Sequence, residues 1–222
     1  MGVEDISSVA QDYLKVIWSA TEWGGPPIST KGLAGRLGTT QANVSETLRR
    51  LAEQQLVDYR PYKPAALTSR GTELAVAMVR RHRLIETFLV TCLGYDWDEV
   101  HDEAEQLEHA VSDLMIERID ELLGHPVADP HGDPIPSPDG TPLRPADTIQ
   151  LPEATPGIYT VVRISDADPH ILARLTTHNI TPGVHLRVHA TPGSALTTRV
   201  TGPNGQPLTT TDTATIRVRN LK

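Results

Sequence analysis

Metal-binding side chains are crowded between residues 101 and 110, where the sequence reads HDEAEQLEHA. If this stretch is helical, His101, Glu105, Glu108 and His109 share one face, because they are spaced i, i+4, i+7 and i+8. Imidazole nitrogens next to carboxylate oxygens suit first-row divalent metal ions. We therefore predict a metal-binding face on this helix.

His82 and Glu86, in the stretch HRLIE, form another pair with i, i+4 spacing on a preceding helix. Neither pair alone fills a coordination sphere, so complete sites must be assembled from several helices. The competing interpretation is that all these side chains belong to solvated helix faces. Repulsion among Glu105, Glu108 and their acidic neighbours is costly without a cation, which favours the metal interpretation.

The length and composition favour a chain of several domains. Its 222 residues exceed the usual domain of about 100–150, so we expect two or three modules. The single cysteine, Cys92, excludes an internal disulfide, and no N-terminal apolar run resembles a signal peptide or a membrane span. We expect a cytoplasmic protein with no membrane partner.

Charge is distributed unevenly along the chain. The formal net charge is −8, yet Thr30–Arg83 has ten Lys and Arg residues against four acids, a net charge of +6. From Asp96 to Glu121 there are eleven Asp and Glu residues against Arg118 alone. A basic module is therefore followed by an acidic one, and the basic module is the candidate for binding nucleic acid.

The N-terminal pattern predicts a winged helix-turn-helix. The stretch ISSVAQDYLKVIWSATEW has apolar residues at helical spacing, with Ser7 or Ser8 as N-cap. Two amphipathic helices follow, separated at Gly38, and the second begins after Thr39 or Thr40 as N-cap. The stretch LVDYRPYKPAALTSRG then gives two short β-prone runs, which is the form of a wing hairpin.

The rest of the chain predicts a helical part and a small β-barrel. We expect one helix from Thr68 to about Thr91 and another from Asp96 to about Leu123, opened by a capping box of Asp96 and Glu99. Residues 125–157 are too rich in proline for a helix and predict a linker, either free or partly docked. β-branched runs with TPG and PNG turns follow it. The predicted fold is a mainly α N-terminal part and a small all-β SH3-like barrel, with domains 1–73, 74–141 and 142–222.

The order of these elements and their motifs resembles one family. A winged helix followed by VRRHRLIETFL, GYDWDEVHDEAEQLEHAVSD and DPHGDPIP is similar to the diphtheria-toxin-repressor family of metal-dependent transcriptional repressors. The resemblance runs from about Val9 to Pro136, and the last part is more loosely similar to the SH3-like third domain of that family. It implies a homodimer that binds a palindromic double-stranded DNA operator when loaded with Fe(II) or Mn(II), controls metal uptake and homeostasis genes, and has no small-molecule substrate.

The resemblance also implies two sets of metal ligands. The primary site would consist of Asp12, Glu105, Glu108 and His109. The ancillary site would consist of His82, Glu86 and His101, completed from the third domain by Asp166, with Asp168 and His170 close enough to compete. Arg163 falls where the iron regulators have a second, carboxylate ligand.

The predicted metal is Mn(II), with two ions per subunit. The iron-sensing branch has methionine where this chain has Asp12 and cysteine where it has Glu105, so hard oxygen replaces soft sulfur at both positions. Lys15 stands where the short manganese regulators have a glutamate ligand, which favours two separate mononuclear sites over one dinuclear site. An Fe(II)- or Zn(II)-dependent regulator of the same architecture is the alternative.

The predicted DNA contacts lie on the second helix of the helix-turn-helix and on the wing. The N-terminal part of such a helix reads base edges, while backbone contacts fix its register. The resemblance implies base or methyl contacts from Thr40, Ala42 and Glu46. Phosphate contacts would come from Asn43, Ser45, Thr47, Arg50, Arg60 and Lys63.

A dinuclear metallohydrolase is the rival class. It would need an open coordination position and usually a general base outside the metal ligands. Nothing in the sequence singles out such a base, and the basic winged helix would have no role. We therefore expect no enzyme.

Overall fold

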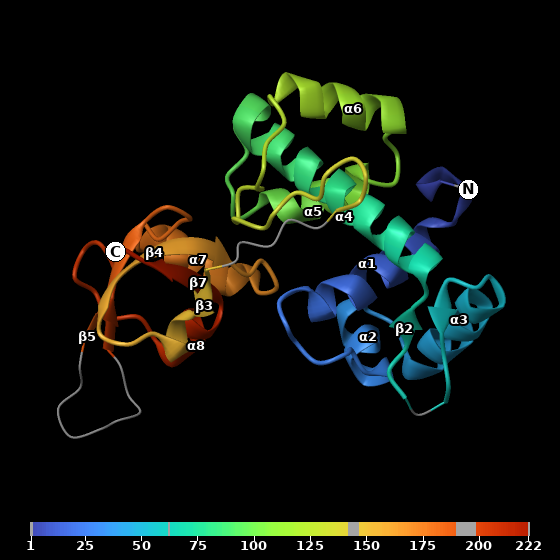
Figure 1. Cartoon of the computed structure of the whole chain (residues 1–222), viewed down its shortest axis with the longest axis horizontal. Coiled ribbons are helices and arrows are strands. Elements are labelled where there is room, and N and C mark those ends of the chain that lie inside the picture. The colour runs from blue at the N-terminus through green and yellow to red at the C-terminus, as the bar shows by residue number, and fades with distance from the viewer. Residues whose placement is uncertain (1, 62, 142–146, 190–198, 222) are drawn as a thin grey trace. The chain divides into compact units, whose positions relative to one another are not determined.

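The computed structural model describes residues 2–61, 63–141, 147–189 and 199–221 (Figure 1). The chain divides into two compact units. The first contains Met1–His82, Glu108–Ile116 and Pro136–Pro142, and the second contains Arg83–Leu107, Glu117–Ile135 and Leu143–Lys222. The three domains predicted above remain a prediction.

The first unit contains the predicted winged helix-turn-helix, with η1 (Val3–Asp5), α1 (Ser8–Glu22), α2 (Thr30–Arg36), α3 (Gln41–Glu53), β1 (Val57–Asp58) and β2 (Ala66–Leu67). Each of the three α-helices begins after a hydroxyl N-cap that accepts a backbone N–H bond: Ser7, Ser29 and Thr40. Gly38, with φ +59°, makes the turn between α2 and α3. The two strands pair antiparallel as the wing.

One apolar cluster holds these helices together. Leu14, Leu33, Val44 and Leu48 are fully buried in it, and Met78 joins from α4 (Ser69–Phe88). Each such side chain contributes about 1.5–3 kcal/mol by burial. Figure 1 shows α1, α2 and α3 gathered beside the wing. The core fixes how α1 and the recognition helix α3 are oriented within this unit.

The helix predicted from residue 68 to about 91 is confirmed. α4 is followed directly by the short π-helical segment η2 (Leu89–Leu93). Gly94 ends it in the left-handed conformation with φ +75°.

The single helix predicted from Asp96 to Leu123 is wrong. The structure has α5 (Val100–Leu107), a turn, and then α6 (Asp113–Leu122). The Arg81 guanidinium donates to the backbone carbonyls of Glu108 (3.1 Å) and Val111 (2.9 Å), so these groups are satisfied without a continuous helix. Ser112 then caps α6, because its Oγ accepts from the Met115 amide. Glu108 and His109 therefore lie in the turn and not on the helix.

The C-terminal part of the second unit is a five-stranded antiparallel sheet with strand order β3-β7-β4-β5-β6. Its strands are β3 (Ile149–Gln150), β4 (Gly157–Ile164), β5 (His185–His189), β6 (Arg199–Thr201) and β7 (Ile216–Asn220). A short 3-10 turn, η3 (Leu151–Glu153), follows β3. The fold agrees with an SH3-like barrel.

The all-β expectation for this part was incomplete, because the structure adds α7 (Pro169–Thr177) and α8 (Thr210–Ala214) beside the sheet (Figure 1). Asp168 caps α7 by accepting from the backbone N–H groups of His170 and Ile171, and Pro169 occupies the first turn. The Asp168-Pro169 pair is a signal for the start of a helix. The β-branched runs around it led us to expect strands alone. The barrel core contains Tyr159 and Ile164, and Trp97 packs against that core.

Candidate metal centres and nucleic-acid interface

The structure brings three of the four predicted primary ligands together within the first unit. Asp12 comes from α1, and Glu108 and His109 come from the turn after α5. Their ligand atoms lie within 4.8 Å of one another. His109 Nε2 is 3.0 Å from Asp12 Oδ1 and 3.7 Å from Glu108 Oε1. This set of oxygen and nitrogen donors fits a first-row divalent ion.

Glu108 is fully buried between two basic side chains. Lys15 Nζ lies 2.5 Å from its Oε1, and His82 Nδ1 lies 2.6 Å from its Oε2. Burial raises the pKa of Glu108, but the hydrogen bond and charge of His82, together with Lys15, outweigh that effect and lower it overall. Glu108 is therefore an ionised carboxylate at neutral pH. His82, predicted as an ancillary ligand, here contacts a predicted primary ligand.

Gln11 contacts the candidate primary site, and the sequence reasoning missed it. Its buried amide Nε2 donates to the carbonyls of Val3 (2.9 Å) and Ile6 (3.2 Å), which orients the amide oxygen toward His109. That oxygen lies 2.7 Å from His109 Nδ1. With its hydrogen on Nδ1, a neutral His109 leaves Nε2, 3.0 Å from Asp12 Oδ1, as the nitrogen that would bind a metal ion. No sequence signal marks this contact, because it depends on tertiary packing.

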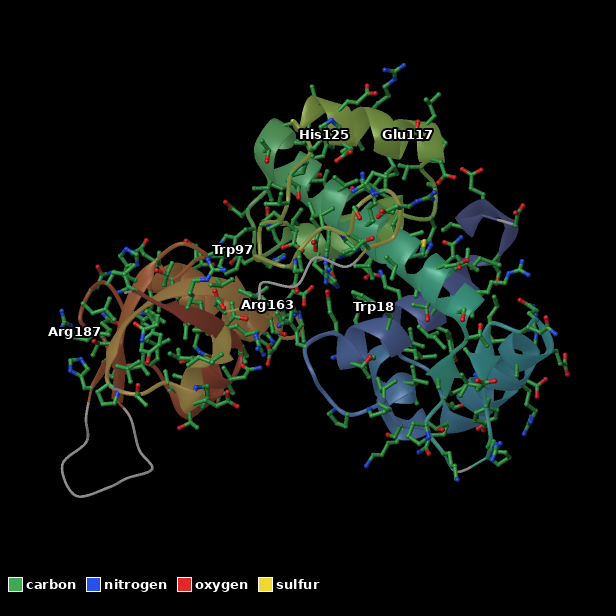
Figure 2. All side chains as sticks on the ribbon, viewed as in Figure 1. Trp18, Trp97, Glu117, His125, Arg163 and Arg187 are labelled. Carbon is green, nitrogen blue, oxygen red and sulfur yellow. The ribbon has the colours of Figure 1, made fainter. Side chains whose placement is uncertain are left out.

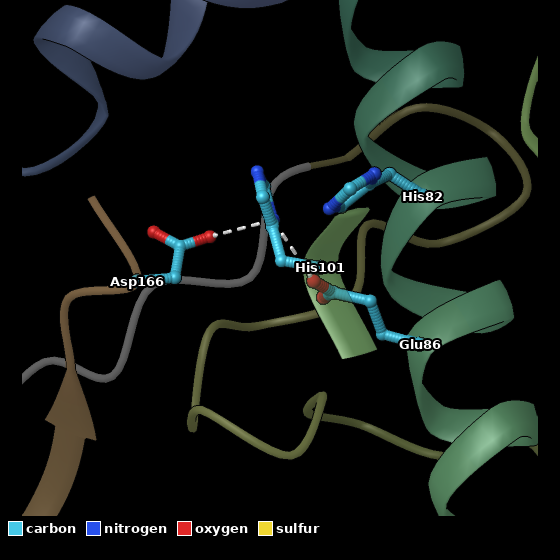
Figure 3. Close-up of side chains that lie close together, drawn as sticks. All are labelled: His82, Glu86, His101 and Asp166. Carbon is cyan, nitrogen blue, oxygen red and sulfur yellow. Dashed lines mark hydrogen bonds and ion pairs between the residues drawn. The ribbon is translucent and has the colours of Figure 1, made fainter. Parts of the chain in front are cut away.

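A second cluster lies within the second unit and contains Glu86 from α4, His101 from α5 and Asp166 from the loop after β4 (Figure 3). His101 Nδ1 is 3.3 Å from Glu86 Oε1 and 3.5 Å from Asp166 Oδ2. Burial and the charge of Glu86 raise the pKa of Asp166, but His101, His131 and Arg163 lower it overall. His82 lies one turn before Glu86 on the same helix.

The other predicted ligands have the following positions. Glu105 lies one turn after His101 on α5, with 3.5 Å between His101 Nε2 and Glu105 Oε1. Asp168 is occupied as the cap of α7, and His170 lies in the first turn of that helix. Among the three candidates from the third domain, Asp166 is the one that faces His101.

A third group, Glu86, Asp129 and His131, was missed, and all three residues are buried with ligand atoms within 4.8 Å of one another. His131 donates from Nε2 to the carbonyl of Trp97 at 2.7 Å, and its Nδ1 lies 3.8 Å from Glu86 Oε2. Burial lowers the pKa of His131, but the nearby carboxylates of Glu86, Asp129 and Asp166 raise it to about 9. The motif DPHGDPIP contains two of these residues, yet its prolines made the segment read as a linker.

The residues predicted to contact DNA lie on or next to α3 and the wing, and their role stays a prediction. On α3 and the wing, Thr40, Ala42, Asn43, Glu46, Arg50, Arg60 and Lys63 are exposed, while Ser45 and Thr47 are half-buried. The Thr40 hydroxyl accepts from the Asn43 amide as the helix cap, at 3.2 Å. Glu46 forms an exposed ion pair with Arg49. The apolar face of α3, with Val44 and Leu48, packs inward, so the polar face is available to a partner.

Comparison with known proteins agrees with this arrangement. The N-terminal DNA-binding domain of iron-dependent repressors matches residues 5–65, and their metal-binding and dimerisation domain matches residues 68–137. A FeoA domain matches residues 149–220. The chain is thus a winged-helix DNA-binding protein with a metal-binding and dimerisation domain.

Solved structures and curated relatives define the family. A manganese-dependent transcriptional repressor in complex with manganese is 49% identical, with 96% of this chain and 100% of that chain covered and a TM-score of 0.86. The manganese regulator SloR is 34% identical, with coverages of 96% and 98% and a TM-score of 0.79. The iron-dependent repressor IdeR of Mycobacterium tuberculosis is 28% identical over 212 residues, which cover 90% of this chain and 92% of IdeR. The chain belongs to the diphtheria-toxin-repressor family of metal-dependent transcriptional repressors.

None of the helices in the described part of the chain has the length and apolar character that a bilayer crossing requires.

Proposed function

We propose that this chain is a Mn(II)-activated repressor that binds palindromic operators as a homodimer and controls genes of metal uptake and homeostasis. One observation carries the proposal. Asp12, on a helix of the DNA-binding module, lies within ligand distance of Glu108 and His109, which come from a turn about ninety-five residues later. A shared ion would tie the orientation of α1 to that turn.

The donor atoms support Mn(II). In the proposed primary site, Asp12, Glu105 and Glu108 offer carboxylate oxygens and His109 an imidazole nitrogen, and the single cysteine, Cys92, is not in any of the clusters. Hard oxygen ligands favour Mn(II) relative to softer ions, although geometry must still overcome its weak intrinsic affinity. When bound, the ion supplies positive charge among these carboxylates. The two manganese regulators that resemble this chain are consistent with the assignment.

The second proposed ion lies at Glu86, with His101 and Asp166 as further ligands and His82 as the fourth predicted one. Asp129 and His131 converge on the same Glu86 carboxylate and extend the donor set. Glu86 has one oxygen near His101 and the other near His131. It could therefore bind an ion beside either histidine. We propose two ions per subunit, one at each of these clusters.

The proposed switch acts through α1. When Asp12 is held with Glu108 and His109, α1 and the core that it shares with α3 lose orientational freedom. The recognition helices of two subunits then fit half-sites one helical turn apart more often. A coupling of about 1–3 kcal/mol between metal and DNA binding is typical of such linkage.

The proposed homodimer uses α6, which exposes Leu114 (61%), Met115 (46%) and Leu122 (66%). Large apolar side chains exposed together on one helix suit burial against a second copy of the chain. Ala110, just before α6, is also exposed, whereas Ile119 on α6 is buried within the chain.

The proposed contacts to DNA are the base-facing Thr40, Ala42 and Glu46 and the backbone-facing set of Asn43, Ser45, Thr47, Arg50, Arg60 and Lys63. All of them except the half-buried Ser45 and Thr47 are exposed, which supports the assignment. The backbone set positions the helix, and the base-facing set provides sequence preference.

The proposal is tested by selecting operator sequences from random DNA with the full chain and Mn(II). The affinity for the selected sequence is then titrated separately with Mn(II), Fe(II), Co(II) and Zn(II). We expect a palindromic consensus and the strongest activation by Mn(II) at physiological concentrations. Stronger activation by Fe(II) or Zn(II) would show that Mn(II) is the wrong metal, but the chain would still be a metal-dependent repressor. Equal affinity with a chelator would overturn metal-dependent binding.

A further inference from the structure

Asp133 joins two parts of the second unit that are far apart in the sequence. Its buried Oδ1 lies 2.6 Å from Arg163 Nε, on strand β4 of the barrel, and 3.4 Å from Arg83 Nη2, on helix α4. Arg83 Nε also lies 3.5 Å from Asp129 Oδ2. One carboxylate is thus shared between a guanidinium of the helical part and a guanidinium of the barrel.

The loop that carries Asp133 is built to hold this position. Asp129 Oδ1 accepts from the backbone N–H groups of His131 and Asp133, each at 2.9 Å. Gly132 has φ +86°, and a Cβ added there would lie 2.0 Å from the carbonyl oxygen of Val162 on β4. Only glycine therefore permits the loop to approach the strand so closely. The backbones also bond directly, since the Ile164 amide donates to the His131 carbonyl at 2.9 Å.

An apolar contact accompanies these polar ones. Trp97, before α5, packs against the barrel core, and its ring lies 5.5 Å from the His131 ring (Figure 2). The Trp97 carbonyl accepts from His131 Nε2. The contact therefore combines a buried ion pair, a backbone hydrogen bond and aromatic packing.

We propose that residues 126–136 are a built-in docking site for the SH3-like barrel, with the Arg163–Asp133 ion pair as its central contact. The barrel is held on α4 by the protein's own charges before any metal binds. Arg163 lies three residues before Asp166. Anchoring Arg163 therefore places Asp166 beside His101 and Glu86 in advance. This second part rests on the proposed function, whereas the docking itself does not.

The electrostatics of the loop explain why an arginine is suited to this position. Arg163 acts on the carboxylates of both Asp133 and Asp166. Beside Asp133, burial together with the charges of Asp133 and Glu86 raises the pKa of Asp129 well above its usual value. A guanidinium is always charged and can bond a carboxylate while buried, so Arg163 offsets part of this repulsion permanently. Its side chain is 13% exposed and that of Asp133 is 4% exposed, so solvent screening is limited.

Docking is tested by hydrogen exchange on the metal-free full chain, comparing Arg163→Met with Arg187→Met. Arg187 is exposed on β5 of the same sheet and is labelled in Figure 2, so its replacement is a matched control. In Arg163→Met we expect exchange about tenfold faster at the Ile164 amide and in residues 126–136, the factor expected from losing a hydrogen bond to a charged group. The β7 amides should keep their protection, and the control should match the wild type.

Two outcomes would overturn the ion-pair anchor. One is wild-type protection of Ile164 in Arg163→Met. The other is loss of protection throughout the barrel, which would mean that Arg163 serves folding rather than docking. Asp133→Asn provides a second variant that keeps the side-chain size, and Arg163→Lys should restore part of the protection. If Gly132→Ala alone speeds exchange at the Ile164 amide, the close contact between the loop backbone and β4 holds the barrel, and the ion pair does not.

Ligand placement is tested separately by calorimetry with Mn(II). Outer partners of metal ligands typically contribute about 10–100-fold in affinity. We expect Arg163→Met to weaken one of two binding events by that factor and to leave the event at Asp12, Glu108 and His109 unchanged. Equal weakening of both events would overturn the placement of Asp166. If the wild type binds no Mn(II), the proposed function fails, while the metal-free exchange result still decides the docking.

Discussion

A basic side chain lies beside each of the two proposed metal clusters. Lys15 lies at the first cluster and Arg163 near the second, and the two make different contacts. Lys15 bonds directly to Glu108, which we propose as a ligand, and so occupies an oxygen that an ion would use. Arg163 bonds to Asp133, which is not a proposed ligand, and holds the loop that borders the second cluster. If both clusters bind metal as proposed, Lys15 competes with the ion, whereas Arg163 prepares a site for it. The comparison suggests a responsive primary site and a more preformed second site.

Exposure does not distinguish the two clusters, because each combines a buried carboxylate with partly exposed ligands. In the first cluster Glu108 is fully buried, whereas the side chains of Asp12 and His109 are 30% and 24% exposed. In the second cluster the side chain of Glu86 is 1% exposed, whereas those of His101 and Asp166 are 36% and 29% exposed. The distinction between the clusters therefore rests on the contacts of Lys15 and Arg163.

The largest expected effect follows Glu108→Ala. It removes a proposed ligand, so metal-dependent DNA binding should be abolished. It also leaves Lys15 and His82 buried without their carboxylate, a loss that typically costs about 3–5 kcal/mol. Urea unfolding of the metal-free chain, with the exposed Asp102→Ala as control, measures the second effect separately. Retained Mn(II)-dependent operator affinity in a folded Glu108→Ala protein would contradict the primary-site assignment.

The next effect concerns which metal activates the protein. Combining Asp12→Met with Glu105→Cys replaces two hard oxygen ligands by soft sulfur, which favours Fe(II), Co(II) or Zn(II) relative to Mn(II). Operator affinity measured across the four ions should therefore change its ranking. An unchanged ranking would mean that geometry or the second cluster, and not ligand softness, selects the metal.

Lys15→Met should raise the affinity for Mn(II) at the primary site, which is a smaller effect than the losses above. Removing the ammonium from Glu108 leaves more negative charge for a divalent ion. Charges a few ångströms apart near a protein surface interact by a few kcal/mol, so Mn(II) affinity at this site should rise on the order of tenfold. Calorimetry measures it, alongside the Arg163→Met variant, whose affinity should fall. If both variants shift in the same direction, the two cations do not differ in the way proposed.

The sequence predicted the winged helix well because its signals are local: hydroxyl caps at Ser7 and Thr40, and Gly38 at the turn. It failed where distant residues decide the structure. The break between α5 and α6 depends on Arg81, twenty-seven residues before Glu108. The orientation of His109 depends on Gln11, and the roles of Asp129 and His131 depend on a proline-rich loop being packed rather than free. The ligand types could be predicted from spacing and resemblance, but their partners could not.

The smallest effect is expected where neither cluster is touched. Arg50→Ala removes an exposed positive charge from the DNA-facing side of α3. Because phosphate contacts act through counterion release, affinity should fall similarly for specific and unrelated sequences, and the salt slope should decrease by about one. Operator binding at several salt concentrations measures this, with the exposed Arg187→Ala on β5 as control. The ratio of affinities with and without Mn(II) should stay unchanged, because the coupling runs through α1 and not through Arg50. A change in that ratio would mean that the metal clusters and the DNA surface are not separable, and a change in sequence preference would place Arg50 among the base-reading residues.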